Sequence, residues 1–315
     1  MNPRSGKHWA VHLGLIAVLL VMNWLLPIYH HTNFARIMVL SIFAMGYNIA
    51  FGFTGLLSLG HALLFAAGMY GAGLTSQLLQ WAALPALLVG VAAGGIMAAL
   101  VGLLALRTKG VSFMIVTLMF AQTGYLCILY FGGITGGDEG LVIAAPLRVL
   151  LGLDLAAEET RYLVAWALFS VALIANLALV RAPFGRIMVA MRENEDRSQM
   201  LGYDPYRTKL MVLIISGLYA GAAGAAFGLM FGYVGASFAT IQYSILPLLW
   251  VLLGGAGVVL GPFIGALIMF YLIDVSSSFT TASLGVVGLS LLVLVLFAPR
   301  GILGLVRERL LPWLP

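Results

Sequence analysis

The sequence predicts an all-α integral membrane protein, a polytopic bundle of about ten transmembrane helices. Of its 315 residues, 62% are hydrophobic and 9% are charged, and the mean hydropathy is +1.07. Soluble proteins contain roughly 25% charged residues, so 16 Lys/Arg and 11 Asp/Glu are too few to cover a water-soluble domain of this length. Apolar runs of about 20 residues, the length that crosses the hydrocarbon layer, recur along the chain. We therefore expect residues 1–315 to form a single transmembrane domain.

Ten apolar runs are expected to cross the membrane, at residues 9–28, 36–57, 60–79, 84–106, 111–131, 160–181, 209–234, 243–255, 258–275 and 282–298. The first run follows Arg4 and Lys7, as the apolar part of a signal peptide would. It is nevertheless about 20 residues long, and no A-x-A cleavage site follows it. We expect it to be retained as the first helix.

Two stretches interrupt this regular pattern. Residues 243–255 are too few to cross alone, so the segment either starts earlier, near Phe238, or is a broken helix surrounded by protein. The glycine-rich stretch 52–60 is similarly irregular. If two short helices were re-entrant, eight spans would remain. Irregular stretches at 52–60 and 235–244 would also suit a five-plus-five inverted repeat, because each follows the first span of its half.

The distribution of basic residues favours a topology with both termini in the cytoplasm. With the N terminus inside, 13 of the 16 Lys and Arg residues lie on the inner side, and only Arg36, Arg148 and Arg161 remain outside. Both ends can be cytoplasmic only if the number of spans is even. Two longer loops result, an outer one at 132–159 and an inner one at 182–208 with the densest charge in the chain.

Ionisable chemistry within the spans is sparse. No charged residue falls in the middle of a predicted span, which disfavours a proton- or cation-coupled carrier, because such proteins keep an ionisable group at depth. His12 and His61 lie within spans, where a hydrogen-bonded structural histidine is the favoured interpretation over a proton relay. The single Cys127 excludes an intrachain disulfide and a CxxC metal site. No metal site is expected.

Glycines at four-residue spacing predict close helix approach. Two such ladders occur, Gly224-Gly228-Gly232 and Gly257-Gly261-Gly265. Packing within one bundle is the favoured interpretation, and dimerisation is the alternative.

The inner loop 182–208 predicts two short helices. The first covers about 185–192. The second has Asn194 as its N-cap, carries Glu195 and Asp196 in its first turn, where the macrodipole favours acids, and stops at Gly202.

The charged residues of this loop indicate what kind of partner it contacts. Glu193 and Arg197 are spaced to pair at i, i+4. A short amphipathic helix could lie on the bilayer, but four acidic residues among the basic ones make a poor binder of anionic lipid and a plausible protein-docking surface. A self-capped loop with solvated charges is the remaining alternative.

Six blocks of the sequence resemble, in order, those of one transporter family. They are Phe53-Thr-Gly-Leu-Leu-Ser-Leu-Gly-His61, Arg107-x-x-Gly-x-x-Phe-x-x-x-Thr-Leu118, Thr135-Gly-Gly-Asp-Glu-Gly-Leu141, Gly185-Arg-x-x-x-Ala-x-Arg-Glu-Asn-Glu195 with Leu201-Gly-Tyr-Asp204, Leu253-Gly-Gly-Ala-Gly257 with Gly261-Pro262, and Ala298-Pro-Arg-Gly-Ile302. Together they resemble the permeases of branched-chain amino-acid ABC importers, specifically the M-type of the two membrane subunits.

The resemblance implies a permease of the bacterial inner membrane that moves branched-chain or related amino acids into the cytoplasm by alternating access. Its implied partners are an H-type permease subunit, two cytoplasmic ATP-binding subunits and a periplasmic substrate-binding protein. Lys7, Lys109 and Lys209 precede His, Gly and Leu, so the chain has no GxxxxGK[ST] motif. We expect no enzyme activity and no cofactor in this chain, with ATP used by the partner subunits. The scattered basic residues do not predict nucleic-acid binding.

Site residues follow from the same resemblance. Contact with the ATPase is expected from the inner loop, at Arg186, Arg192, Glu193, Asn194, Glu195 and Gly202. Polar residues in otherwise apolar spans are candidates for the substrate path, with helix–helix hydrogen bonding as the alternative: Asn48, Thr54, Ser58, His61, Thr117 and Gln122. The outer mouth, or a simple surface turn of the periplasmic loop, is expected at Thr135, Gly136, Gly137, Asp138 and Glu139.

Two other functions stay open at this point. The family includes permeases for urea and short amides, and Gly202-Tyr-Asp-Pro205 is compatible with either substrate class. A self-sufficient channel or secondary carrier is the alternative from a different class. The missing intramembrane charges and the inner loop count against it.

Overall fold

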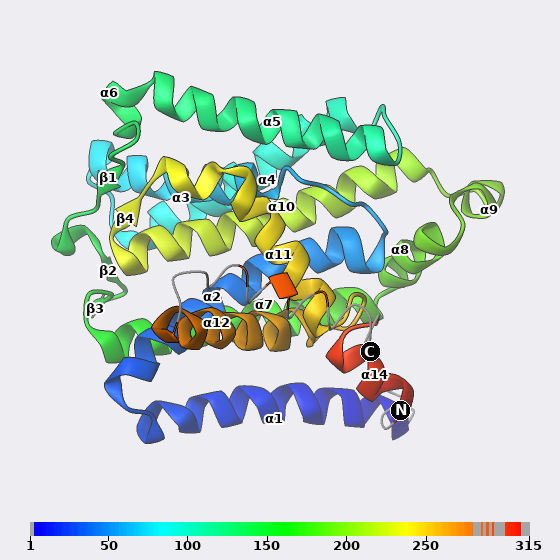
Figure 1. Cartoon of the computed structure of the whole chain (residues 1–315), viewed down its shortest axis with the longest axis horizontal. Helices are drawn as coiled ribbons and strands as arrows, with labels where there is room; N and C mark the ends of the chain where they lie inside the picture. Colours follow the sequence, from blue (N-terminus) through cyan, green and yellow to red (C-terminus); the bar gives the residue numbers. More distant parts are fainter. Residues whose placement is uncertain (1–2, 280–284, 286–287, 290–291, 293–299, 310–315) are drawn as a thin grey trace.

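A computed structural model describes residues 3–279, 285, 288–289, 292 and 300–309, and it is an all-α polytopic membrane protein (Figure 1). Eight described helices are long and apolar enough to cross a membrane. They are α1 (Pro3–Leu25), α2 (Ile28–Asn48) with its continuation η1 (Ile49–Phe53), α3 (His61–Leu79), α4 (Ala83–Ala105), α5 (Val111–Tyr130), α7 (Glu158–Arg181), α10 (Pro205–Phe231) and α12 (Gly261–Phe279). The predicted span 282–298 lies largely outside the described residues.

Shorter elements connect these helices. Helices α8 (Pro183–Glu193) and α9 (Glu195–Met200) link α7 to α10, and α14 (Ile302–Arg309) lies near the C terminus. Between α5 and α7 the chain forms α6 (Gly132–Thr135), η2 (Ala145–Leu147) and three two-residue strands, β1 (Leu141–Val142), β2 (Val149–Leu150) and β3 (Leu153–Asp154). After α10 come β4 (Tyr233–Val234), η3 (Ala236–Ala239) and α11 (Ile241–Gly254).

The segment around 243–255 is a short helix. Its 14 residues in α11 contain Pro247, and 1.5 Å of rise per residue makes it shorter than the roughly 30 Å hydrocarbon layer. The chain does not extend it upstream as α-helix, because η3 is a 3-10 helix that ends at Thr240 in extended conformation. The helix therefore does not start near Phe238; it is a short continuous helix that packs on α2, α3 and α12 within the bundle.

The stretch 52–60 is irregular as predicted. Helix α2 ends in the π-helix η1, and residues 54–60 form no helix before α3 begins at His61. Single π-turns within α-helices are frequent at functional sites, because the widened turn frees backbone carbonyls from their usual partners.

Helices α2 and α10 form the centre of the bundle. Helix α10 packs on α2, α3 and α4, and α2 also packs on α7, α11 and α12. Glycines allow the closest approach: a Cβ added at Gly224 would lie 2.0 Å from the Phe65 carbonyl oxygen of α3. The predicted packing within one bundle therefore holds for α10.

Each glycine ladder nevertheless contains a residue with another role. Gly232 and Gly257 have φ angles of +71° and +77° and belong to turns instead of helices. Glycine is required there because L side chains rarely adopt a positive φ. Gly261 and Gly265 do pack in a helix, where they allow α12 to approach α11 closely.

Two helices form the edges of the bundle. Helix α5 lies along one side and α1 along the opposite side (Figure 1). Only 17% of the apolar window is buried in each, and large apolar side chains such as Trp24 on α1 and Met119 on α5 are 71% and 63% exposed. Such surfaces require lipid or another subunit as their surroundings.

The connecting segments divide between the two ends of the bundle. Helices α8, α9 and α14 and the first turn of α1 lie at one end, and α6 and all four strands lie at the other (Figure 1). Strand β1 pairs antiparallel with β4, with Leu141 opposite Val234. This pairing fastens the loop 132–159 to the turn that follows α10.

Candidate functional site

The segment 182–208 forms the two short helices that its sequence predicts. Pro183 occupies the first turn of α8, where its missing N–H costs no hydrogen bond. Asn194 caps α9: its Oδ1 accepts a hydrogen bond from the Arg197 N–H at 2.8 Å. Gly202, at φ +92°, ends the helical segment. Asp204 then caps α10 by accepting from the Arg207 N–H at 3.2 Å.

One face of this segment packs on the bundle and the other projects from it. Met188 and Met191 are the buried methionines of α8. At the tip, Met200 is 86% exposed and Leu201 is 72% exposed, beside charged side chains of α9. An apolar tip among charged residues is the composition expected of a surface that another protein covers.

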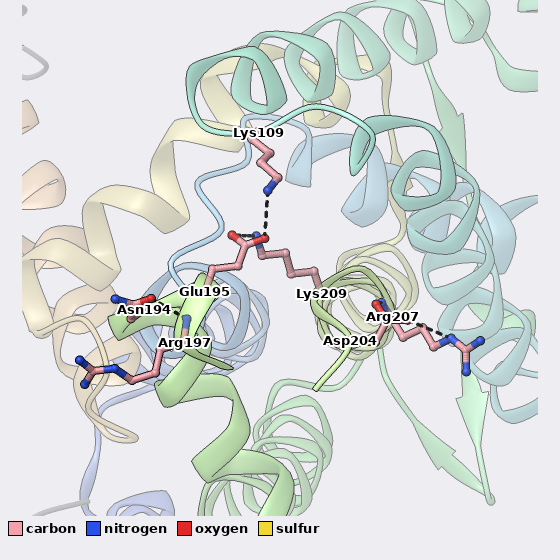
Figure 2. Close-up of polar contacts among 7 residues, drawn as sticks. All are labelled: Lys109, Asn194, Glu195, Arg197, Asp204, Arg207 and Lys209. Carbon is pink, nitrogen blue, oxygen red and sulfur yellow. Dashed lines mark hydrogen bonds and ion pairs between the residues drawn. The ribbon is translucent and has the colours of Figure 1, made fainter. Parts of the chain in front are cut away.

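Glu195 anchors the projecting segment to the bundle. Its carboxylate accepts a hydrogen bond from Lys209 Nζ at 2.5 Å and lies 3.6 Å from Lys109 Nζ. Figure 2 shows the carboxylate between the two ammonium groups, which come from α10 and from the turn between α4 and α5. Partial burial alone would raise the pKa of Glu195, but the hydrogen bond and positive charge of Lys209, together with Lys109, hold it below its ordinary value of 4.5.

We expect the anchoring of α9 to be lost in acid. Because the pKa of Glu195 is lower in the folded chain, the ion pairs stabilise the fold above the ordinary pKa and this contribution disappears as the pH falls through the lowered value. Hydrogen exchange of the amides in 195–200, corrected for intrinsic rates, should therefore accelerate below about pH 4.5. Glu195→Gln should remove this pH dependence, whereas Glu193→Gln should leave it intact. An unchanged profile in Glu195→Gln would contradict the assignment.

The predicted pair between Glu193 and Arg197 is not formed. The salt bridges among the described residues join Glu195 to the two lysines and Asp204 to Arg207. Both Glu193 and Arg197 are exposed. The break at Asn194, with φ of −159°, rotates α9 away from α8, so residues 193 and 197 do not share one helical face.

Arg192 is exposed, but its guanidinium reaches back to the bundle. Its guanidinium donates a hydrogen bond to the carbonyl oxygen of Gly52, within the π-helix η1. A Cβ added at Gly257 would lie 3.1 Å from Arg192 Nη1, and one at Gly55 would lie 3.3 Å from its Cγ. The absent side chains at these glycines make room for the arginine.

Near Arg192, the end of α2 meets the turn between α11 and α12. Asn48 is fully buried; its Nδ2 donates to Val258 O and its Oδ1 accepts from Gly257 N, each at 3.0 Å. The end of α2 is thereby fastened to the turn between α11 and α12. Arg192 therefore connects the projecting segment 182–208 to the point where these two helix breaks meet.

A cleft opens beside this junction. It has a volume of about 720 Å³ and lies between residues 54–57, the turn 106–114 and the segment from α8 to the start of α10. Arg192, Glu193, Asn194 and Glu195 all contribute to its wall. Four of the six residues expected to contact the ATPase therefore line one concave surface, and Arg186 and Gly202 are exposed outside it.

Hydrogen bonds within the protein engage five of the six candidates for the substrate path. Beyond Asn48, Thr54 Oγ1 donates to Ile49 O at 3.0 Å and Ser58 Oγ accepts from Gly60 N at 3.2 Å. Thr117 Oγ1 accepts from Leu59 N at 3.2 Å, joining α5 to the irregular stretch. These contacts satisfy polar groups where the chain leaves helical geometry.

His61 belongs to a buried hydrogen-bond chain that crosses three helices. Its Nε2 lies 2.8 Å from Ser216 Oγ, and the Ser216 hydroxyl donates to Gly46 O at 2.6 Å. Because the serine proton is engaged, the imidazole must donate through Nε2. Gln122 differs from the other candidates: among the described residues it forms no hydrogen bond, and it is half-buried on α5.

The residues expected at the outer mouth lie at the end opposite α8 and α9 (Figure 1). Thr135 Oγ1 donates to Ile128 O at 2.6 Å and accepts from Gly137 N at 3.2 Å. Gly136 has a φ of +76°, and the side chains of Asp138 and Glu139 are exposed as predicted. The Tyr233 hydroxyl donates to Glu139 O at 3.2 Å, so the turn is held against β4.

The sequence did not indicate the role of Arg148. Its Nε donates to Leu229 O at 2.8 Å and its Nη2 to Met230 O at 2.5 Å. These carbonyls end α10, where a cation is favourable. Burial lowers the pKa of Arg148, with repulsion from Arg161 adding to that effect. The feature of the sequence that could have indicated this role is that Arg148 is the one basic residue in the acidic loop 132–159.

Comparison with known proteins identifies the family. Residues 32–298 match the model of the family described as "Branched-chain amino acid transport system / permease component". The chain belongs to this family. The match covers both helix breaks, the segment 182–208 and the loop 132–159, so the whole junction around Arg192 is family sequence.

Curated relatives agree with this family. The chain is 30% identical over 300 residues to the high-affinity branched-chain amino acid transport system permease protein LivM of Salmonella typhimurium, covering 87% of this chain and 69% of the relative. LivM of Escherichia coli is 29% identical with the same coverage, and the probable LivM of Methanocaldococcus jannaschii is 25% identical, covering 81% and 68%. The permease is therefore LivM-like. No solved structure matches the chain.

Proposed function

We propose that this chain is the membrane-spanning permease subunit of an ATP-driven importer that carries branched-chain or related amino acids into the cytoplasm by alternating access. The observation that carries the proposal is the junction at Arg192, because it gives a family permease a rigid connection from a projecting docking segment to the centre of its bundle. A self-sufficient channel or carrier has no need of such a segment.

The proposed coupling runs through three contacts. ATPase subunits grip the exposed face of α8 and α9, at Arg186, Glu193 and Asn194. Movement of α8 shifts the guanidinium of Arg192 and with it η1. Because Asn48 binds the turn at 257–258, the α11–α12 turn moves together with α2. Packed helices transmit displacement because their contacts are close and stiff.

The remaining partners follow from the same proposal. The H-type subunit covers an exposed apolar face of the bundle, and a periplasmic substrate-binding protein docks at the end that carries Thr135 to Glu139. The termini, α8 and α9 face the cytoplasm, where the excess of basic residues favours them. ATP is bound by the partner ATPases, since the chain has no phosphate-binding loop of its own.

The deciding experiment is uptake of radiolabelled leucine into proteoliposomes that contain this chain together with an H-type subunit and ATPase subunits, with a substrate-binding protein added outside. We expect uptake that requires both ATP and the binding protein. Glu193→Ala should lower uptake and ATPase association together by at least about fivefold, because a charge-assisted contact to the partner is lost while membrane insertion is unaffected.

Lys7→Ala is the control, since this position lies near the start of α1 and outside the segment 182–208. Leucine uptake without ATP would support the carrier or channel instead. Uptake of urea or a short amide, but not leucine, would support the other substrate class of the family.

A further inference from the structure

Arg36 is an exposed charge on an otherwise covered helix. Helix α2 is the most buried of the eight candidate spans. From His31 to Phe53, Arg36 is the one exposed residue, and all the others are buried or half-buried. Among the described residues, no neighbouring helix covers the Arg36 side chain.

The Arg36 side chain lies beside the last turn of α10. The Arg36 guanidinium is 4.8 Å from the centroid of the Phe231 ring, and that of Arg161 is 5.4 Å from the same centroid. Two cations on one ring concentrate positive charge at the end of the bundle opposite α8 and α9 (Figure 1). A ring face attracts a cation but satisfies none of the five N–H donors of a guanidinium.

The neighbouring arginines are already engaged. Arg148 donates to the last carbonyls of α10. Arg161 donates to Leu155 O at 3.3 Å and to Ala156 O at 2.8 Å. In the part of the chain that the structure describes, Arg36 forms no hydrogen bond and no salt bridge. Capping of α10 therefore does not explain Arg36, and its donors remain available to an anion.

Aromatic rings continue from this charge. Phe231 packs against Phe227 with centroids 4.6 Å apart, Phe227 against Phe238 at 5.2 Å, and Phe238 against Tyr243 at 4.8 Å. All four rings are half-buried. A guanidinium at the edge of an apolar wall matches a ligand that has a carboxylate at one end and an aliphatic group at the other.

We propose that Arg36 binds the carboxylate of the transported amino acid as it enters from the outer end, with the aromatic wall at Phe231 facing its aliphatic side chain. The proposal rests on the proposed function and names the group that recognises the substrate within the permease itself. The requirement for a carboxylate would then reside in this chain as well as in the binding protein.

The test measures binding of radiolabelled leucine to the complete permease–ATPase complex in phosphatidylcholine nanodiscs, without ATP or binding protein. Unlabelled leucine should displace the label, and leucinamide, which lacks the carboxylate, should not. Arg36→Gln should weaken binding by at least about tenfold, because a charge-assisted pair is lost. Arg36→Lys should retain part of the affinity, because an ammonium keeps the charge without the planar fork. Arg207→Gln, an equal charge change at the opposite end, should have no effect.

Unchanged leucine affinity in Arg36→Gln would overturn the proposal, as would displacement of leucine by leucinamide in the wild type. A lipid phosphate is the other source of an anion. If phosphatidylglycerol in the nanodiscs is retained through Arg36 while leucine binding does not respond to the substitution, the site is a lipid site. ATP-dependent uptake by the wild-type complex tests the proposed function separately, because that result does not depend on the role of Arg36.

Discussion

Replacing Arg192 by Ala should uncouple ATP hydrolysis from transport. The exposed face of α8 and α9 would remain, so we expect the ATPase subunits to bind and hydrolyse ATP. Uptake per ATP hydrolysed should fall at least about tenfold, because the hydrogen bond from a charged donor to Gly52 O is lost and such bonds contribute about 1.5–3 kcal/mol. Measuring both rates in the same proteoliposomes gives this ratio directly. Arg192→Lys should be intermediate.

Arg197→Ala is the matched control for this experiment. Arg197 has the same charge, lies in the same segment and is exposed like Arg192, but among the described residues its guanidinium forms no hydrogen bond to η1. Its removal should leave the ratio of uptake to hydrolysis unchanged. If Arg192→Ala instead lowers ATPase binding, with the ratio intact, Arg192 contacts the ATPase directly, as the sequence alone suggested.

Replacing Gly224 by Ala should prevent stable folding of the bundle. The added Cβ would lie 2.0 Å from Phe65 O and 3.0 Å from Met69 N, both backbone atoms of α3 that no rotamer change can move. Separating α3 from α10 would open the centre of the molecule. We expect a loss of at least about 3 kcal/mol, at the upper end of overpacking costs, seen as a lower melting temperature in detergent and reduced abundance in the membrane.

Gly14→Ala provides the comparison for Gly224. Nothing lies within 4 Å of a Cβ added at Gly14, on the exposed side of α1. Because alanine favours helix over glycine by about 1 kcal/mol, this variant should be neutral or slightly stabilised. Equal melting temperatures for the two variants would contradict the close approach of α3 and α10.

Sequence patterns of short range predicted much of the fold. The membrane class followed from composition, and most of the spans followed from apolar runs, because a bilayer imposes one length on every crossing. The capped helices of 182–208 followed from Asn194 and Gly202, since a cap depends on residues within a few positions. Six ordered sequence blocks led to the family that the comparison confirms.

The partners of the charged residues were decided only by tertiary structure. Arg192 looked like a surface contact but reaches Gly52, 140 residues away in the chain. Glu195 pairs with Lys209 and Lys109 instead of acting as a free surface charge. Such pairs depend on how α2, α4 and α10 pack, and that packing cannot be predicted from the spacing of residues along the sequence.

The sequence alone determined that this protein lies in a membrane, where its spans approximately lie and which family it belongs to, because these depend on composition and on the order of nearby residues. What only the tertiary structure decided is how the segment 182–208 reaches the helix breaks, and which of the arginines at 36, 148 and 161 keeps its donors available. Arg36, Arg148 and Arg161 are alike in the sequence, and they differ because Arg36 is exposed beside an aromatic ring and the other two donate to backbone carbonyls.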